Sequence, residues 1–361
     1  MRILFTYFVP SGGVETVNRF RAHALRQVGI DSHLLYLHDG AGRQNIRDIP
    51  LFVTNDNADM QAILNTYQYD AIVCVCDHLM LQRLRGLGYA GPLLYEAQGL
   101  GSREQAFGTL HAASLFIRMY ASGVLTSETP HLMEICNELL SDYPRFYMKN
   151  LLDTDLFSYR PAPWINPTQA PVLAWVGRIE RNKNWLLYLQ IAAILVERYP
   201  LLQLWMFEDA NIYEPDERAS FEAVLDRLSL RSRLILRSNI PHDHMPYYYS
   251  AIGDSGGLLV STSHIESFGY AIAEAMSCRC PVLTTDSDGV RGTVIQDVTG
   301  GYFDGTPLGG SQASVRLIED AALRMAVRLQ GEAYIRETFS FSRYAASFNS
   351  VMIALGIRPP G

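Results

Sequence analysis

The chain opens with a pattern that leaves few choices of fold. Residues 3–9 form an apolar run that ends at the turn 10–13 (PSGG), and residues 14–28 carry apolar side chains at roughly helical spacing. Gly29 ends this helical segment, and residues 32–37 form a second apolar run. A strand, a glycine turn, a helix and a further strand make a βαβ unit, which requires a parallel sheet covered by helices. The sequence therefore predicts an α/β fold.

The same pattern starts again after a proline-rich connector, residues 161–171. Residues 172–176 form an apolar strand, residues 185–198 a helix and residues 201–207 the next strand. Because 361 residues exceed what one hydrophobic core usually supports, we expect two domains with the connector between them. The predicted parts of the chain are residues 1–160, residues 161–335 and a C-terminal segment, residues 336–361.

Charge and cysteine spacing exclude several classes of function. The formal net charge of −7 disfavours nucleic acid as a partner. Cys74 with Cys76, and Cys278 with Cys280, lack the C-x-x-C spacing of zinc or redox sites, so we expect no metal and a reducing compartment. The opening apolar run stops at Pro10, too early for a signal peptide, and no segment approaches the roughly 18 apolar residues of a membrane span. We therefore expect a cytoplasmic protein with at most peripheral contact at the inner face of a membrane.

The most informative stretch runs from Ser261 to Val290. Glu266 and Glu274 are separated by a loop and the start of a helix near Phe268-Gly269. The N–H groups and positive dipole end of a helix start suit a phosphate, and a glycine there lets the ligand come close. Carboxylates are poor phosphate ligands, so the two glutamates should accept hydrogen bonds from the hydroxyls of a sugar and a ribose. This combination indicates a nucleotide-sugar.

Each of these features also has a purely structural explanation. Surface glutamates that bound an amphipathic helix are common, and two glycines in a turn often serve the turn alone. The context favours a site, because residues 281–285 look like a buried strand and residues 286–289 like a loop at its carboxyl end, where ligands of open α/β sheets bind. Gly12 and Gly13 would likewise place helix-start N–H groups at the ligand edge of the first sheet. Their spacing is not G-x-G-x-x-G, so the sequence does not support a nicotinamide site.

Four segments carry a family resemblance. They are Glu266–Glu274 with the following Ala275-Met276 and Pro281-Val282, Val176–Lys183, Asn150–Phe157, and Val298–Phe303. In this order they are similar to the E-x7-E element, the G-R-x-x-x-x-K loop, the N-G-V-D-x-x-x-F motif and the glycine turn after the donor site of GT-B glycosyltransferases, specifically the large retaining family four (glycosyl transferases group 1). The resemblance covers most of the chain. It implies two Rossmann-like α/β domains that face each other across a cleft, with a C-terminal helix that returns to the N-terminal domain.

The resemblance also implies a catalytic role for two cations. Arg178 and Lys183 would neutralise the donor diphosphate as its charge grows during departure of the leaving group. Backbone N–H groups near Phe268 and Gly269 would help. Electrostatic stabilisation of this kind is often the largest single contribution to catalysis.

The remaining donor contacts follow from the same resemblance. Glu274 would hold the ribose hydroxyls and Glu266 the hydroxyls of the transferred sugar. Ile240 and Pro241 lie where the family forms its base pocket. Gly12-Gly13 would complete the donor site from the first domain.

Three positions depart from the family pattern. Gln98 stands where the family often has a histidine; it can hold a sugar hydroxyl but cannot titrate, and Glu96 and His78 are nearby substitutes. We nevertheless count Gln98 among the catalytic candidates. Residues 207–209 (FED) stand where the family tends to have a G-x-G turn, and Gly292 stands where a glutamate is common.

The function that the resemblance implies is metal-independent retaining transfer of a hexose from a nucleotide diphosphate sugar to a glycan, lipid-linked or small-molecule acceptor. A UDP-sugar is the first choice of donor and a GDP-sugar the second. The donor is a substrate, so no cofactor is expected. The departures leave two alternatives open, a GT-B nucleotide-sugar epimerase and a nucleotide-sugar-binding protein that has lost catalysis.

Overall fold

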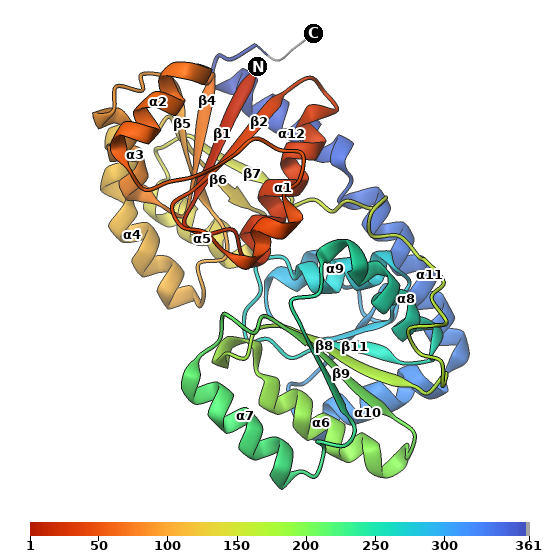
Figure 1. The fold of residues 1–361 in the computed structure, drawn as a ribbon. Coiled ribbons are helices and arrows are strands. Elements are labelled where there is room, and N and C mark those ends of the chain that lie inside the picture. The colour runs from red at the N-terminus through yellow and green to blue at the C-terminus, as the bar shows by residue number, and fades with distance from the viewer. Residues whose placement is uncertain (359–361) are drawn as a thin grey trace. The chain divides into compact units, whose positions relative to one another are not determined.

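The computed structural model describes residues 1–358, which fold into two compact units (Figure 1). The first unit holds Met1–Asp153 together with the segment from Phe339 onward, and the second holds Thr154–Thr338. The divisions predicted from the sequence, after residues 160 and 335, lie a few residues away from these. The passage into the second unit comes just before the proline-rich connector.

The first unit is a helix-covered parallel sheet. Its strands are β1 (Arg2–Tyr7), β2 (Asp31–Tyr36), β3 (Leu51–Val53), β4 (Ala71–Val75), β5 (Leu93–Ala97), β6 (Gly123–Ser127) and β7 (Arg145–Met148). Its helices are α1 (Gly12–Arg26), α2 (Asn57–Tyr67), α3 (His78–Gly86), α4 (Arg103–Tyr120), α5 (Pro130–Leu139) and α12 (Phe341–Ala354). All neighbouring strands pair in parallel, in the order β3-β2-β1-β4-β5-β6-β7.

Local sequence explains where several of these helices begin. The Asp56 side chain accepts hydrogen bonds from the first-turn N–H groups of α2, and Asp77 accepts one from the Met80 N–H of α3 at 3.0 Å. Ser102 and Gln105 form a reciprocal capping box at the start of α4. A cap of this kind contributes about 1 kcal/mol to helix stability, so short polar residues set these boundaries.

Helix α1 starts earlier than its apolar pattern predicts. The periodic side chains indicated a helix from residue 14 to about residue 28, whereas α1 spans Gly12–Arg26. Gly12 has φ +65°, a conformation that glycine adopts without steric cost. The chain therefore turns into the helix at Gly12, and Gly12-Gly13 lie in the first turn of α1.

The C-terminal helix belongs to the first unit, as the sequence analysis predicted. Helix α12 packs against α1, and Figure 1 shows the two side by side. The Phe348 ring lies 6.1 Å from that of Phe5, and the Phe341 ring lies 6.1 Å from that of Phe20. The Leu152 N–H donates to the Phe339 carbonyl at 2.9 Å, which joins the two ends of this unit's chain.

The second unit has the same construction with six strands. Its strands are β8 (Val172–Val176), β9 (Gln203–Glu208), β10 (Leu234–Ser238), β11 (Leu258–Ser261), β12 (Val282–Thr285) and β13 (Gly301–Phe303). Its α-helices are α6 (Trp185–Arg198), α7 (Pro215–Arg227), α8 (Met245–Asp254), α9 (Tyr270–Ser277), α10 (Pro307–Glu319) and α11 (Ala321–Thr338), and its short 3-10 turns are η2 (Arg181–Lys183), η3 (His242–His244) and η4 (Gly289–Gly292). The parallel strands run in the order β10-β9-β8-β11-β12-β13. Helix α6 contacts α7 and α10 on one side of the sheet, and α9 contacts α8 and α11 on the other (Figure 1).

Strong local patterns locate elements of this unit well, and weak ones do not. The bounds of β8 and α6 match the sequence prediction. The apolar positions between residues 334 and 355 are scattered and belong to two helices, since α11 ends at Thr338 and α12 begins at Phe341. The break falls where the Phe339 backbone pairs with Leu152 of the first unit, a long-range contact that no local pattern encodes.

Both units are thus Rossmann-like α/β folds, as predicted. The strand order reverses direction between β1 and β4 in the first sheet and between β8 and β11 in the second. Such switch points lie where α/β proteins bind their ligands, at the carboxyl edge of the sheet. We therefore expect the loops that follow these strands to carry a binding site.

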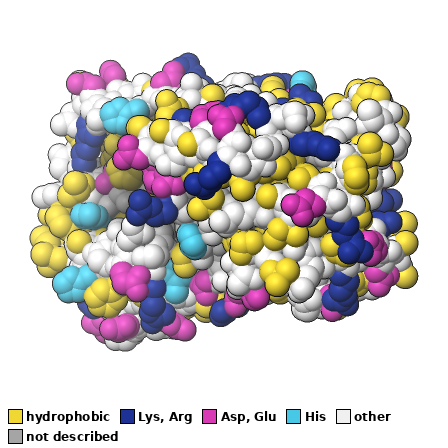
Figure 2. All heavy atoms as spheres, turned by 90° about the horizontal axis from the view of Figure 1, so that it is seen from below, with side chains coloured by type: hydrophobic (Ala, Val, Ile, Leu, Met, Phe, Trp, Pro, Cys, Tyr) yellow, Lys and Arg dark blue, Asp and Glu magenta, His cyan; other side chains and the backbone are white. Residues whose placement is uncertain are grey.

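The surface is mixed in charge. On the face shown in Figure 2, basic and acidic side chains are scattered among each other and among hydrophobic ones. Several of the charges are paired, for example Arg118 with Asp142 at 2.8 Å and Arg198 with Glu319 at 2.6 Å. Exposed pairs of this kind contribute at most about 1 kcal/mol each. Within residues 1–358, no helix combines the length and the apolar character needed to cross a membrane.

Candidate functional site

The carboxyl edge of the second sheet gathers most of the residues predicted for the donor. The loop after β8 supplies Arg178 and Lys183, and the loop after β11 supplies Glu266, Phe268 and Gly269. The remaining three are Ile240 and Pro241, which follow β10, and Glu274, which lies on α9.

The loops after β8 and β11 are fastened to each other. The Asn182 side chain donates to the Ile265 carbonyl at 3.1 Å and accepts from the Ile265 N–H at 3.2 Å, while its backbone carbonyl accepts from the His264 N–H at 2.9 Å. Thr262 donates to the Lys183 carbonyl at 3.0 Å. These bonds hold the two loops in one arrangement, so the side chains that they carry are positioned before any ligand arrives.

Lys183 and Glu266 form the ion pair at the centre of this edge. The Lys183 Nζ lies 2.5 Å from Glu266 Oε1, and the two side chains are 21% and 16% exposed. Ser263 Oγ also donates to Glu266 Oε1, at 2.7 Å. Arg178 is more exposed, at 44%, and pairs with Glu180 at 3.1 Å. The structure therefore places one cation inside the site, held by a carboxylate, and a second at its rim.

Two glycines shape the start of α9. Gly269 precedes the helix with φ +75°, and the Phe268 ring packs edge-on against Tyr270 at 4.9 Å. Gly289 approaches the same loop so closely that an added Cβ would lie 2.2 Å from the Ser267 carbonyl oxygen. The Glu266 backbone bonds to Ser287 at 2.9 Å and to Gly289 at 3.0 Å. This packing aims the first-turn N–H groups of α9 at the sheet edge, where they can bind an anion.

Glu274 is buried and held by two donors, His242 and Tyr249, that no motif in the sequence marks. Its Oε1 lies 2.8 Å from His242 Nε2, and its Oε2 accepts from the Tyr249 hydroxyl at 3.0 Å. Burial raises the pKa of Tyr249 well above its usual value, and Glu274 raises it further, so the phenol stays a donor. His242 follows Pro241 directly, and this adjacency to the predicted base pocket was the only available signal in the sequence.

In the first unit, Gln98 is part of a buried polar network. Its Nε2 donates to Glu96 Oε1 and to Asn150 Oδ1, each at 3.0 Å. Glu96 Oε2 accepts from Arg21 at 2.6 Å, and both members of this ion pair are almost fully buried. Burial by itself lowers the pKa of Arg21, but Glu96 and Tyr344 together raise it above its usual value. Glu96 is thus committed to the network.

Gly12 and Gly13, the other candidates from the first domain, form the first turn of α1. An alanine Cβ at Gly12 would meet nothing within 4 Å, so only the positive φ demands glycine there. His78, the other substitute considered for the histidine, packs against the Phe116 ring at 4.9 Å. The structure thus divides the predicted residues between the units: Gly12, Gly13 and Gln98 lie in the first, and the remaining candidates lie in the second.

The other departures from the family pattern have local explanations. Glu208 ends β9 and pairs with Arg218 of α7, and it also accepts from Ser238 Oγ of β10 at 3.0 Å. The carboxylate thereby ties three elements together where the family tends to have a glycine turn. Gly292 has open space around it, because an added Cβ would meet nothing within 4 Å.

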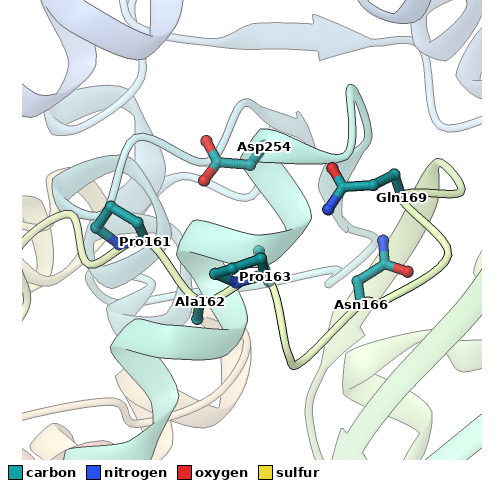
Figure 3. Close-up of a pocket in the computed structure, with 7 residues that line it drawn as sticks. Pro161, Ala162, Pro163, Asn166, Gln169 and Asp254 are labelled. Carbon is teal, nitrogen blue, oxygen red and sulfur yellow. The ribbon is translucent and has the colours of Figure 1, made fainter.

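A cavity of about 200 Å³ lies elsewhere in the second unit (Figure 3). The residues that line it come from the connector and α8: Pro161, Ala162, Pro163, Asn166, Gln169, Ala251 and Asp254. Asp254 bonds to Arg328 at 2.5 Å and to the Tyr159 hydroxyl at 3.1 Å, so it fastens the segment just before the connector to the unit. The residues predicted for the donor are not among those that line the cavity.

The chain is similar to known glycosyltransferases in sequence. D-inositol 3-phosphate glycosyltransferase from Xylanimonas cellulosilytica is 26% identical over 195 residues, which are 54% of this chain and 45% of the relative. Alpha-D-kanosaminyltransferase from Streptomyces kanamyceticus is 28% identical over 130 residues, which are 36% of this chain and 31% of the relative. The chain thus spans less than half the length of these curated relatives in the matched regions.

The similarity in structure covers nearly the whole chain. HepE from Anabaena, solved with UDP and glucose, has a TM-score of 0.81 at 20% identity and matches 98% of this chain and 100% of its own. Sucrose-phosphate synthase from Thermosynechococcus elongatus has a TM-score of 0.80 at 18% identity, over 99% of each chain. At this level of identity, the likeness is one of fold.

The family model described as glycosyl transferases group 1 matches residues 161–328, most of the second unit. This region includes Lys183, Glu266 and Glu274. Over this region the chain is similar to the glycosyl transferases group 1 family, and its two Rossmann-like units are of the kind found in the GT-B fold.

Proposed function

We propose that the protein transfers a hexose from a nucleotide diphosphate sugar to a glycan, lipid-linked or small-molecule acceptor, with retention of configuration and without a metal. The observation that carries the proposal is the convergence of Lys183, the start of α9 and the Glu274 carboxylate at one sheet edge. The first two groups suit a diphosphate and the third suits a ribose. The transferase names of the relatives favour transfer over epimerisation.

The contact between Lys183 and Glu266 supports separate roles for the two residues, one at the diphosphate and the other at the transferred sugar. In a nucleotide-sugar the transferred sugar is bonded directly to the terminal phosphate. A carboxylate 2.5 Å from a phosphate-binding lysine therefore lies where the sugar hydroxyls begin. Lys183 would neutralise the diphosphate as the sugar bond breaks, with Arg178 and the N–H groups near Phe268 assisting, and Glu266 would hold the sugar.

The network around Gln98 supports an acceptor role for its carbonyl oxygen. The Gln98 amide donates to Glu96 through its nitrogen, and its oxygen accepts from Asn150 Nδ2 at 3.4 Å, which leaves one lone pair of that oxygen available. That oxygen can accept a bond from a substrate hydroxyl, but it cannot take the proton. In the proposed reaction a phosphate oxygen of the donor removes the proton of the acceptor hydroxyl, so no protein base is needed.

The nucleotide is the first point to test. We propose a UDP-sugar before a GDP-sugar, and the complex of HepE with UDP supports that order. A thermal-shift panel of UDP, GDP, ADP and dTDP sugars should show one nucleotide raising the melting temperature, because a ligand that binds only the folded state stabilises it. If no nucleotide-sugar raises it, the proposed function is wrong.

Transfer itself is tested with two cations of the same short turn, η2. Lys183→Ala should lower transfer by about 100-fold or more, because removal of one donor that stabilises transition-state charge has effects of that order. Arg181→Ala is the matched control, since the Arg181 side chain is 84% exposed and pairs only loosely with Glu217, at 3.7 Å. Its activity should stay within about 2-fold of the unchanged protein.

The transfer assay is run with and without EDTA for the unchanged protein and for both variants. Loss of turnover in EDTA would contradict metal independence, and equal activity of the two variants would contradict the role of Lys183. Nuclear magnetic resonance of the donor alone separates transfer from epimerisation. Inversion at a ring carbon without an acceptor would establish the alternative.

A further inference from the structure

The Glu274 carboxylate is held more tightly than a surface glutamate needs to be. Its side chain is 5% exposed, and each of its two oxygens meets a donor from a different element. His242 comes from η3 and Tyr249 from α8, whereas Glu274 lies on α9. Two consecutive segments, η3 and α8, therefore converge with the more distant α9 on one carboxylate.

The donors are arranged so that the carboxylate retains acceptor sites. A carboxylate has about four lone-pair sites, two on each oxygen. Tyr249 takes one site on Oε2 and His242 takes one on Oε1. One site on each oxygen is left, and such a pair matches the two neighbouring hydroxyls of a ribose.

A buried aromatic ring fixes the imidazole. The Phe157 ring lies 4.8 Å from that of His242 and 6.4 Å from that of Tyr249. The Phe157 carbonyl accepts from Ser277 Oγ of α9 at 2.5 Å. Phe157 thus connects α9, which carries Glu274, with the His242 imidazole that bonds to Glu274. The last residue of the segment Asn150–Phe157 therefore has a structural role.

We propose that Tyr249 and His242 are positioning residues that aim the Glu274 carboxylate at the 2′ and 3′ hydroxyls of the donor ribose, with Phe157 holding the imidazole in place. This assignment rests on the proposed function, because it needs a nucleotide at the edge of the second sheet. Tyr249 and His242 need not touch the nucleotide themselves. They determine whether the protein distinguishes a ribonucleotide from its 2′-deoxy counterpart.

A purely structural role would have a different consequence. If the two bonds served only to satisfy a buried carboxylate, their loss would lower stability and weaken all nucleotides alike. A positioning role changes the ratio between ribonucleotide and deoxynucleotide affinity. The diphosphate contacts are common to both ligands and cancel in that ratio.

The experiment measures the dissociation constants of UDP and 2′-deoxy-UDP by calorimetry on the full chain, or of GDP and 2′-deoxy-GDP if the thermal-shift panel selects GDP. The unchanged protein should prefer the ribonucleotide by about 10-fold or more, since a hydrogen bond to a charged group is at stake. Tyr249→Phe and His242→Leu should each lower this preference by about 3- to 10-fold, with little change in the deoxynucleotide constant. His242→Gln, which retains a donor, should keep most of the preference.

Neighbouring residues of the same kind provide the controls. Tyr248→Phe alters a tyrosine of α8 that packs against Trp205 and Phe207, and His244→Leu alters the exposed histidine of η3. Both should keep the ribose preference of the unchanged protein. Circular dichroism checks that each variant is folded, and His242→Leu remains informative if Tyr249→Phe is not.

Two outcomes overturn the assignment, and they are distinguishable. If nucleotides bind and the preference is the same in Tyr249→Phe and His242→Leu as in the unchanged protein, the positioning role is wrong while the proposed function stands. If the unchanged protein binds neither nucleotide, the proposed function fails as well.

Discussion

Single residues decide how closely the loops of the second unit approach each other. Turn η4 begins at Gly289 and ends at Gly292, and the two glycines face opposite constraints. A Cβ at Gly289 would lie 2.2 Å from the Ser267 carbonyl oxygen, which is backbone and cannot move aside cheaply. A Cβ at Gly292 would meet nothing within 4 Å, so the glycine is not required there by packing.

These two glycines make a matched test of the close approach. Gly289→Ala should lower the free energy of unfolding by about 1–3 kcal/mol, because the overlap forces backbone to shift, and it should weaken nucleotide binding by moving the start of α9. Gly292→Ala should change stability by no more than about 0.5 kcal/mol. Chemical denaturation measures the free energy of unfolding, and calorimetry measures the affinity for the nucleotide. Equal effects of the two substitutions would contradict the close contact of Gly289 with the Glu266–Gly269 loop.

At the scale of elements, buried charge joins α1 to β5 in the first unit. Arg21 of α1 is fully buried, lies 4.0 Å from the centre of the Phe5 ring and pairs with Glu96 of β5. Burial raises the pKa of Tyr344, on α12, to about 12, so its hydroxyl remains protonated beside Arg21. The network therefore links three elements around the amide of Gln98.

Removal of one charge from this pair should cost more than removal of both. Arg21→Met or Glu96→Gln alone leaves a buried charge without its partner and should lower the free energy of unfolding by about 3–5 kcal/mol. The double substitution should cost clearly less than the sum of the two. Denaturant unfolding followed by circular dichroism measures all three variants. Strict additivity would show that the two side chains do not depend on each other.

At the scale of the whole molecule, the first unit is built from two separate segments of the chain. Helix α12 follows the entire second unit in sequence yet packs against α1. Aromatic contacts to Phe5 and Phe20 and the Leu152–Phe339 backbone bond secure it. The stability of the first unit therefore depends on residues that follow the whole second unit in the sequence.

Truncation after Thr338 tests this dependence. Without α12 the apolar faces of α1 and β1 lose their cover, so amide hydrogen exchange should rise in peptides from these two elements. Peptides from β8 and β11 of the second unit should exchange as they do in the full chain. Mass spectrometry of exchanged peptides measures both. Unchanged protection of α1 in the truncated chain would contradict the assignment of α12 to the first unit.

Much of the fold could be predicted from local patterns. The apolar runs at residues 172–176 and 185–198 became β8 and α6, and the helix start near Gly269 became the start of α9. Burial, periodicity and glycine conformation act over a few residues and leave a direct trace in the sequence. The break between α11 and α12 has no such trace in the local sequence, because it depends on a contact between Phe339 and Leu152.

The sequence by itself determined the α/β class, two successive domains, and the segments that carry the site. The tertiary structure alone decided which side chains meet: Glu266 with Lys183, Glu274 with His242 and Tyr249, and Gln98 with Glu96 and Asn150. Most of these partners lie 25 to 83 residues apart. Local pattern sets the strands and helices, whereas the order of strands in the sheet sets which of their ends become neighbours. A pair of glutamates in the sequence thus became, in the folded chain, one carboxylate bound to a lysine and another held between two donors.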